Sequence, residues 1–307
     1  MARTGLLYSE KMLLHDTGLG HPERPERLTA IVEAFEAAQV DYQRISFGPA
    51  SREDLLRVHS DDHIENIQQT CALGRRYPDP DTPMVAASWE AAMLSAGAAI
   101  RACEAVVDGD IDNAFCAIRP PGHHAESDRA MGFCMFNNVA VGARWLQANA
   151  HAKRIAIFDW DVHHGNGTQQ AFYTDASVYY ASIHQHPFYP GTGWPYERGE
   201  GNTNLNIQMR HGSGDAEWLG AFHEQVVPEF ERFDPDFVLL SAGFDTHRLD
   251  PLGGQMLETE TFVEMTYGLK RFANGRIVSI LEGGYSLEAL GEATVAHFRA
   301  LQDGSDG

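Results

Sequence analysis

The chain has 307 residues, of which 43% are hydrophobic and 21% charged, a composition typical of one folded domain with a substantial core. Its formal net charge of −20 argues against a nucleic-acid partner, because phosphate binding needs basic patches and none stands out. No apolar run approaches the ~18 residues of a membrane-spanning helix, and the first residues lack the apolar core of a signal peptide, so we expect neither a membrane partner nor export.

Short apolar runs alternate along the chain with longer stretches of helical periodicity. This alternation is typical of an α/β domain in which helices wrap a parallel sheet. The predicted strands are residues 6–8, 114–118, 155–158, 178–182, 237–240 and 277–281. The predicted helices are residues 28–38, 89–107, 139–148, 216–231, 261–273 and 287–300. No linker divides the chain, so we expect a single domain over residues 1–307, and residues 185–204, rich in glycine and proline, form a long loop of the kind that often carries function.

The four cysteines are scattered and form no Cys-x-x-Cys pair: Cys71, Cys103, Cys116 and Cys134. This pattern favours reduced, mostly buried thiols over a disulfide framework or a zinc–thiolate site. We therefore expect an intracellular protein with a cytoplasmic location.

Polar residues of the types that do chemistry follow four of the predicted strands. They lie in residues 119–126, 159–164, 241–245 and 282–285. In an open parallel sheet, ligands bind beyond the carboxyl ends of the strands. We therefore expect His, Asp and Tyr side chains from these four segments to gather at one edge of the sheet.

The segment after the predicted strand at 155–158 has the pattern of an open metal site. Asp161 and His163, two residues apart, can hold one metal ion from an extended backbone, and Asp245 supplies a third ligand from a second strand end. Oxygen and nitrogen ligands without thiolate suit Zn²⁺ or Fe²⁺, and three protein ligands leave a position open for water or substrate. The alternative, a capping carboxylate and a hydrogen-bonded core histidine, is disfavoured by the matching position of Asp245.

Two adjacent histidines and a tyrosine complete the set of candidate catalytic residues. Of His123 and His124, one can be held by a buried carboxylate, for which Asp159 is a candidate, while the other moves protons for the reacting water. The phenol of Tyr285 can donate a hydrogen bond to a developing oxyanion. The structural alternatives are a surface loop with tandem histidines and an ordinary half-buried tyrosine.

Four motifs together resemble those of the zinc-dependent histone deacetylase superfamily: Arg-Pro-Pro-Gly-His-His at 119–124, Asp-Trp-Asp-Val-His-His-Gly-Asn-Gly at 159–167, Ser-Ala-Gly-Phe-Asp at 241–245 and Glu-Gly-Gly-Tyr at 282–285. The similarity is closest to the bacterial histone deacetylase-like amidohydrolases and the second eukaryotic class. The resemblance implies the arginase–deacetylase fold, a single α/β domain around a central parallel sheet of about eight strands.

Carried over position by position, the resemblance implies a role for each candidate. Zinc would be bound by Asp161, His163 and Asp245. His124 would be the general base and acid, His123 its electrostatic neighbour and Tyr285 the oxyanion-stabilising tyrosine. A potassium ion beside the zinc would be held by Asp159, Asp161, His163, Ser182 and Ile183. A second monovalent site would fall near Phe172, Asp175 and Val178.

The resemblance also places residues around a narrow substrate tunnel suited to the methylene stem of an acylated lysine. The matching wall and rim residues are Phe133, Tyr189, Leu252 and Pro22. Arg24 falls where members keep an arginine near the acetate exit. The chain has Asn166 where the first class has an aspartate, so the second histidine of the pair would have a neutral partner. Position 285 is a tyrosine rather than the histidine of the weakly active subgroup, which favours a competent deacetylase.

The predicted reaction is removal of acetyl groups from the side-chain amine of lysine by metal-activated water, with longer acyl groups left open. The substrate would be an acyl-lysine peptide, a protein or a small acylated amine. An acetylpolyamine amidohydrolase is the nearest alternative, disfavoured by Leu252 where polyamine-selective members tend to place a glutamate. An arginase-like ureohydrolase with two manganese ions does not fit the tandem histidines, and a non-catalytic acyl-lysine binder would not need the catalytic set. The native metal, the physiological substrate and the oligomeric state stay open, although bacterial members commonly form homo-oligomers.

Overall fold

A computed structural model of the chain describes residues 2–74, 81–149 and 151–303. Its eight strands are β1 (Thr4–Leu7), β2 (Gln43–Arg44), β3 (Asn113–Cys116), β4 (Ile155–Asp159), β5 (Val178–Gln185), β6 (Asn204–Met209), β7 (Phe237–Ala242) and β8 (Ile277–Leu281). Its α-helices are α1 (Glu26–Ala37), α2 (Arg52–Leu56), α3 (Asp61–Ala72), α4 (Ala86–Val107), α5 (Asn138–Ala148), α6 (Asn166–Phe172), α7 (Asp215–Ala221), α8 (Val227–Phe233), α9 (Thr259–Lys270) and α10 (Leu287–Gln302). Short 3-10 turns lie at Glu10–Leu14, Glu200–Asn202 and Ala273–Gly275.

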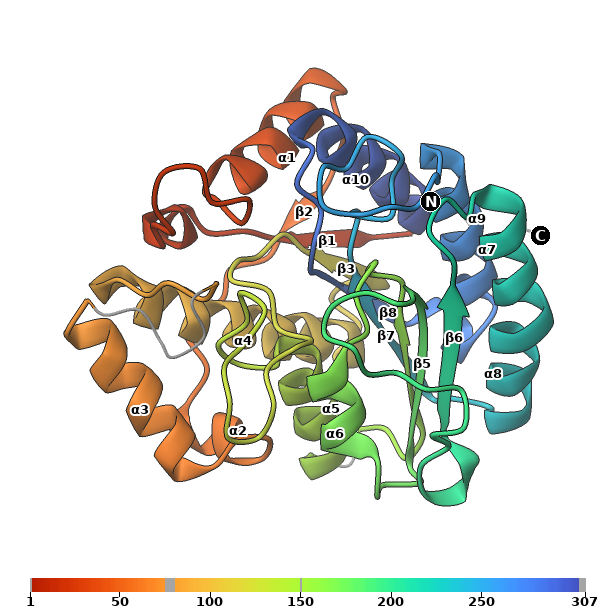
Figure 1. Ribbon diagram of the computed structural model, residues 1–307, viewed down its shortest axis with the longest axis horizontal. Helices are drawn as coiled ribbons and strands as arrows, with labels where there is room; N and C mark the ends of the chain where they lie inside the picture. Colours follow the sequence, from red (N-terminus) through yellow and green to blue (C-terminus); the bar gives the residue numbers. More distant parts are fainter. Residues whose placement is uncertain (1, 75–80, 150, 304–307) are drawn as a thin grey trace.

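The strands form one parallel sheet in the order β2-β1-β3-β8-β7-β4-β5-β6 (Figure 1). Every residue of the central strands β4, β7 and β8 is buried, as expected for strands covered on both faces. The predicted α/β class and the sheet of about eight strands are therefore confirmed.

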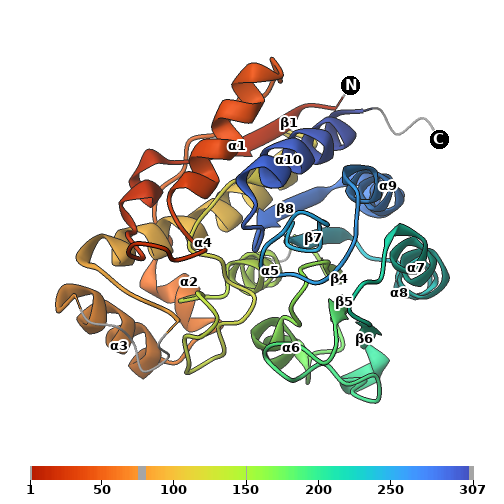
Figure 2. The ribbon, with the colours of Figure 1, turned by 45° about the horizontal axis from the view of Figure 1, so that its top comes forward.

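Helices cover both faces of this sheet (Figures 1 and 2). Helices α1, α10, α9 and α7 follow one another along one face, and α4 packs against α5 on the other. Helix α4 is rich in alanine, and these small side chains let it lie close beneath the strands, where most of its residues are buried. Both chain ends lie at the same side of the molecule, because the Ala2 amide donates a hydrogen bond to the Gln302 carbonyl at 2.7 Å.

All six predicted strands are present, but two edge strands were missed. β2 has only two residues, both exposed. β6 begins at Asn204, the last residue of the predicted long loop, and continues through Leu205, Ile207 and Met209. These three apolar side chains alternate with polar ones, as in an edge strand that faces the core on one side. The predicted loop itself is confirmed to within one residue at each end, since β5 ends at Gln185 and β6 begins at Asn204.

The six predicted helices are also present, while α2, α3 and α6 were missed. The predicted helix at 216–231 runs on to Phe233 and contains a π-helical turn at Phe222–Val226. Helix α3 carries signals that could have predicted it: the Ser60 hydroxyl accepts from the His63 amide as an N-cap, and Ile64, Ile67 and Cys71 lie on one buried face.

The strand order explains why distant segments meet. β3, β8, β7 and β4 are consecutive neighbours, so their carboxyl ends lie side by side at one edge of the sheet. In register, Asp159 at the end of β4 pairs with Ser241 of β7, and Ala242 pairs with Leu281 of β8. The four polar segments therefore begin at nearly the same level, as predicted.

The four cysteines are free and buried, in agreement with the expectation of reduced thiols. Within the described ranges, no helix has the length and apolar character needed to cross a membrane.

Candidate metal and catalytic site

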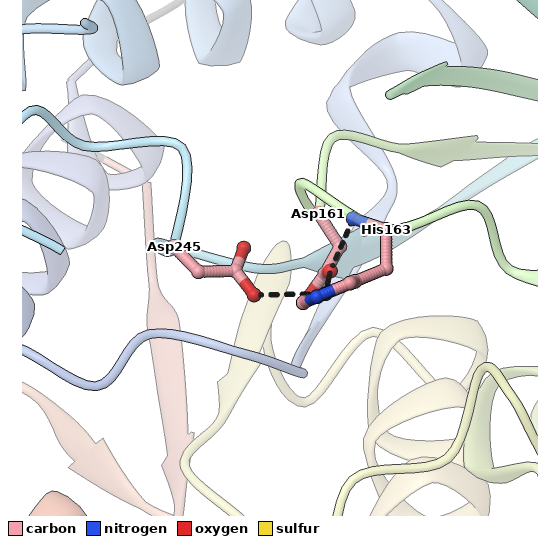
Figure 3. A group of neighbouring side chains, drawn as sticks. All are labelled: Asp161, His163 and Asp245. Carbon is pink, nitrogen blue, oxygen red and sulfur yellow. Dashed lines mark hydrogen bonds and ion pairs between the residues drawn. The ribbon is translucent and has the colours of Figure 1, made fainter. Parts of the chain in front are cut away.

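Three predicted metal ligands meet beyond the ends of β4 and β7. The side chains of Asp161, His163 and Asp245 point toward one another, and each offers one ligand atom within 4.8 Å of the other two (Figure 3). His163 Nδ1 lies 2.9 Å from Asp161 Oδ1 and 3.3 Å from Asp245 Oδ2. All three residues are buried. The structure thus brings together the triad that the sequence predicted.

The chemistry of this triad fits a bound cation. Asp245 Oδ2 is buried and accepts no hydrogen bond of good geometry in the described structure, and the only nearby cationic group is the His163 ring at 3.3 Å. Burial and the nearby Asp161 charge raise the pKa of Asp245 to about 7. Burial alone would lower the pKa of His163, but the two carboxylates raise it to about 9. In the metal-free protein, His163 and Asp245 therefore tend to hold protons at the place where a divalent cation would satisfy the two carboxylates.

Gly283 lies so close to the two carboxylates of the triad that no side chain would fit there. A Cβ atom on Gly283 would lie 2.0 Å from Asp245 Oδ2 and 2.6 Å from Asp161 Oδ2. No real Cβ approaches an oxygen so closely, so a side chain at this position would displace both carboxylates. The Gly283 amide also donates to Asp161 Oδ2 at 2.8 Å. The close approach of backbone explains the glycine of the Glu-Gly-Gly-Tyr motif.

The two adjacent histidines, His123 and His124, differ in charge. His123 Nδ1 lies 3.0 Å from Asp159 Oδ2, and although burial lowers its pKa, Asp159 and Asp161 raise it to about 10. His124 Nδ1 lies 2.8 Å from Asn166 Oδ1, and burial together with the His123 and His163 charges holds its pKa well below the ordinary value. One imidazole is therefore charged and the other neutral at pH 7, with ring centres 4.0 Å apart. Such divergence is typical of acid–base residues.

Tyr285 is held through its backbone by a residue that the sequence did not reveal. Asp250 Oδ2 accepts from the amides of Tyr285 and Ser286 at 2.6 and 3.2 Å. Its other oxygen accepts from the amides of Leu252 and Gly253, so one carboxylate joins the loop after β7 to the start of α10. Burial and the Asp245 charge keep the pKa of the Tyr285 phenol well above its ordinary value, so the group remains a hydrogen-bond donor.

A cavity of about 210 Å³ opens beside these residues, lined by Asp81, Pro121, His123, His124, Gly132, Phe133, His163, Tyr189, Leu252, Gly283 and Tyr285. The predicted wall residues Phe133, Tyr189 and Leu252 line it. Pro22 does not, and its neighbour His21 contacts the Phe133 ring edge instead, at 4.8 Å between ring centres. Phe133 is held at φ +70°, a conformation uncommon outside glycine that is often found at ligand sites.

Phe188 was missed as part of this site. Its ring stacks on the imidazole of His163 at 5.1 Å between centres. The Phe188–Tyr189 pair in the predicted long loop was the available signal, and the prediction used only its second member.

The residues proposed for potassium lie directly behind the triad. Asp159 is in register with Ser182 of the neighbouring strand β5, and both side chains are buried. Asp159 Oδ2 accepts from the Tyr180 hydroxyl at 3.0 Å, and Ser182 Oγ lies 2.9 Å from His184 Nδ1. Ile183 follows on the same strand.

The residues of the second monovalent site lie in one turn between α6 and β5. The Asp175 amide donates to the Phe172 carbonyl, and the Val178 amide donates to the Asp175 carbonyl. The Asp175 carboxylate forms an ion pair with Arg144, whose guanidinium also lies 4.5 Å from the centre of the Phe172 ring. The Asp175 carboxylate is therefore already paired with a positively charged side chain.

The prediction for Arg24 was wrong. Arg24 is exposed, whereas Arg27, one turn later, is buried and donates to the carbonyls of Glu282 and Gly284 at 2.5 and 2.6 Å. Its side chain is paired with buried Glu23 at 3.2 Å. Arg24 lies in the segment just before α1, whereas Arg27 lies in the first turn of that helix and is buried.

Comparisons with known proteins show similarity over nearly the whole chain. The family model described as "Histone deacetylase domain" matches residues 21–301. "Histone deacetylase 5" of Arabidopsis thaliana is 39% identical over 325 residues, which cover 97% of this chain and 49% of that protein. A "Probable deacetylase" of Archaeoglobus fulgidus is 39% identical over 93% of this chain and 82% of its own length. This chain thus spans about half the length of the Arabidopsis relative.

The fold agrees equally well with a solved structure. The crystal structure of the HDA15 HD domain matches with a TM-score of 0.95 at 38% sequence identity, covering 98% of this chain and 91% of that one. The predicted resemblance to this family is therefore confirmed in sequence and in fold. The chain belongs to the histone deacetylase family.

Proposed function

We propose that this protein is a zinc-dependent deacetylase that hydrolyses the amide of an acylated lysine side chain. The observation that carries the proposal is the meeting of four groups around one narrow cavity: the triad of Asp161, His163 and Asp245, charged His123, neutral His124 and the phenol of Tyr285. Amide hydrolysis needs an activated water, a base that later acts as an acid, and a donor for the developing oxyanion. Each need is met by one of these groups.

A zinc ion held by the triad would polarise the amide carbonyl and lower the pKa of a water molecule toward ~7. His124 is neutral and therefore able to take a proton from that water. The same histidine, then protonated, gives its proton to the leaving amine. His123, charged and held by Asp159, lies beside His124 throughout. The Tyr285 phenol donates a hydrogen bond to the carbonyl oxygen as negative charge develops there.

The shape of the cavity supports an acylated, and thus uncharged, lysine stem. Phe133 and Tyr189 supply aromatic walls, and Leu252 supplies an apolar residue where a carboxylate would suit a polyamine. Neutralisation of the lysine amine by the acyl group removes the cost of placing an ammonium among these residues.

Acetylpolyamine hydrolysis is the second candidate, and two observations favour it. Asp81 is the only carboxylate among the described lining residues of the cavity, and its side chain is exposed, at a position where a distal ammonium could meet it. The net charge of −20 would also attract a cationic substrate.

Direct comparison of substrates tests the proposal. The zinc-loaded protein is assayed with an acetyl-lysine peptide, N-acetylputrescine and N8-acetylspermidine, together with its Asp81→Asn variant. We expect the highest kcat/KM for the peptide. A preference for the polyamines that falls in the Asp81→Asn variant would instead establish the second candidate.

We also propose that potassium is held behind the zinc by Asp159, Ser182, Ile183 and the backbone of Asp161 and His163. The register of Asp159 with Ser182 supports this. Activity measured in potassium chloride and in tetramethylammonium chloride at equal ionic strength tests it, and equal rates would contradict it.

A further inference from the structure

The neutral partner of His124 is itself held by a carboxylate. Asn166, the first residue of α6, places Oδ1 2.8 Å from His124 Nδ1. Its Nδ2 donates to Glu126 Oε1 at 2.7 Å, and also lies 3.3 Å from the His124 carbonyl and 3.4 Å from Met131 Sδ. The amide nitrogen thus faces three acceptors, of which the carboxylate is the closest and the only charged one.

A carboxylate in this place decides which way the asparagine amide points. The two ends of an asparagine amide have nearly the same shape, but one is an acceptor and the other a double donor. An ionised carboxylate only accepts, so the amide end facing Glu126 must be the NH2 group. The carbonyl end is then turned toward His124.

The orientation of the amide decides in turn where His124 carries its proton. A carbonyl oxygen facing Nδ1 can only accept, so Nδ1 must carry the hydrogen and Nε2 keeps its lone pair. With the amide reversed, its NH2 group would donate to Nδ1, and the ring proton would move to Nε2. Such a histidine has no free lone pair at the nitrogen that must act as the base.

We propose that Glu126 is a positioning residue, which fixes the Asn166 amide and thereby keeps His124 in the tautomer that can accept a proton at Nε2. This rests on the proposed function, because it takes His124 as the base. An aspartate at position 166 would need no such device, since both its oxygens accept. Glu126 is therefore needed because residue 166 is an asparagine, whose two amide ends differ, and not an aspartate.

The backbone around Glu126 is built to hold this carboxylate in place. Its amide donates to the Arg129 carbonyl at 2.9 Å, and its carbonyl lies 2.9 Å from His59 Nδ1. His59 Nε2 accepts from the Asn137 amide at 2.9 Å, so Nδ1 is the protonated nitrogen of that ring and donates to Glu126. Both backbone groups of Glu126 are thus satisfied, and its side chain is half-buried.

The kinetic test uses two substitutions at position 126 and one control. In Glu126→Leu the amide loses its closest acceptor, and we expect kcat for an acetyl-lysine peptide to fall about tenfold with little change in KM. In Glu126→Gln a side-chain carbonyl can still accept from Asn166, so most of the activity returns. Asp128→Asn removes an exposed carboxylate two residues away in the same loop and serves as the control with wild-type rates.

The same substitution of Glu126 in an Asn166→Asp variant gives a sharper test. In Asn166→Asp the partner of His124 needs no orientation, and two carboxylates now face each other across the short contact with Glu126. Glu126→Gln is then expected to raise kcat relative to Asn166→Asp alone, the opposite of any effect in the wild-type background. A purely structural role of Glu126 would lower activity in both backgrounds.

The tautomer itself is measured by NMR on the zinc-loaded protein with nitrogen-15-labelled histidine, with His124→Ala used to assign the signal. We expect Nδ1–H in the wild type and a gain of Nε2–H in Glu126→Leu. An unchanged tautomer together with wild-type kcat in Glu126→Leu would overturn the proposal. Because this readout needs no substrate, a wild-type protein inactive on acetyl-lysine but with a tautomer that depends on Glu126 would count against the proposed function alone.

Discussion

The guanidinium carbon of Arg27 lies 5.0 Å from the centre of the Tyr285 ring. The same guanidinium donates to the carbonyls of Glu282 and Gly284, so one buried side chain supports the ring of Tyr285 and the backbone that leads to it. Arg27 therefore contributes to the position of the phenol.

Substitution of Arg27 by methionine is expected to lower both activity and stability. Loss of the two backbone contacts frees Tyr285, so kcat falls about tenfold or more while KM changes less. Glu23 keeps its pairing with Arg119 but loses Arg27, which costs about 3 kcal/mol in the free energy of unfolding. Steady-state kinetics and urea unfolding measure the two effects. Exposed Arg24→Met is the control, and an equal loss of activity there would contradict the assignment of Arg27.

Glu282 holds the turn that carries the two histidines. Its Oε2 accepts from the amides of Gly122 and His123 at 2.6 and 3.1 Å. Glu282→Ala leaves two buried donors without this acceptor, and we expect a loss of about 1–3 kcal/mol in the free energy of unfolding for each. Glu282→Gln keeps an acceptor of the same shape and should lose less stability. Equal stability of the alanine and glutamine variants in urea unfolding would refute this role.

Zinc affinity should depend on pH in a way that follows from the triad. In the metal-free protein the pKa of His163 is raised to about 9 and that of Asp245 to about 7, so zinc must displace protons from both below pH 7. The affinity is then expected to rise about 100-fold per pH unit below pH 7, about tenfold per unit between pH 7 and 9, and little above. Chelator competition from pH 6 to 9.5 measures this, and a flat profile would be inconsistent with a proton held by the triad.

Acid should destabilise the protein through histidines buried in their neutral form. Burial lowers the pKa of His59, His184 and His297 to about 3, far below the ordinary 6.5. Their contribution to stability is complete above pH 6.5 and is lost as the pH falls toward 3, at about 1.4 kcal/mol per pH unit for each. His297→Gln should therefore show a shallower fall in the free energy of unfolding between pH 6.5 and 4.5. Parallel curves for variant and wild type would argue against a buried neutral His297.

The sheet and the triad could be predicted because their signals are local. Buried parallel strands are continuous apolar runs, and the residues that follow β4 and β7 belong to the types that bind metals. Since parallel strands end at a common edge, Asp161 and Asp245 could be expected at the same edge of the sheet. That β7 lies beside β4, although two strands separate them in the chain, is seen only in the structure. The edge strand β6 was not predicted because half of its residues are polar, which is common in a strand at the edge of a sheet.

The supporting residues could not be predicted in the same way. Asp250 and Glu282 act on backbone amides of other segments, and nothing in their local sequence indicates which amides these are. Arg24 precedes α1 and Arg27 lies in its first turn, and the local sequence does not indicate which of the two side chains is buried. Glu126 is only two residues beyond His124 in the sequence, but its role becomes visible only when the Asn166 side chain is seen between the two.

We propose that Tyr285 and His124 act on an acyl-lysine amide in the cavity beside the metal triad. The most direct measurement is kcat of the zinc-loaded protein on an acetyl-lysine peptide for Tyr285→Phe and His124→Ala, with the exposed Tyr196→Phe as control. We predict losses of about 100-fold or more for the first two and none for the control. Near wild-type rates in both variants, at full zinc content, would contradict the account.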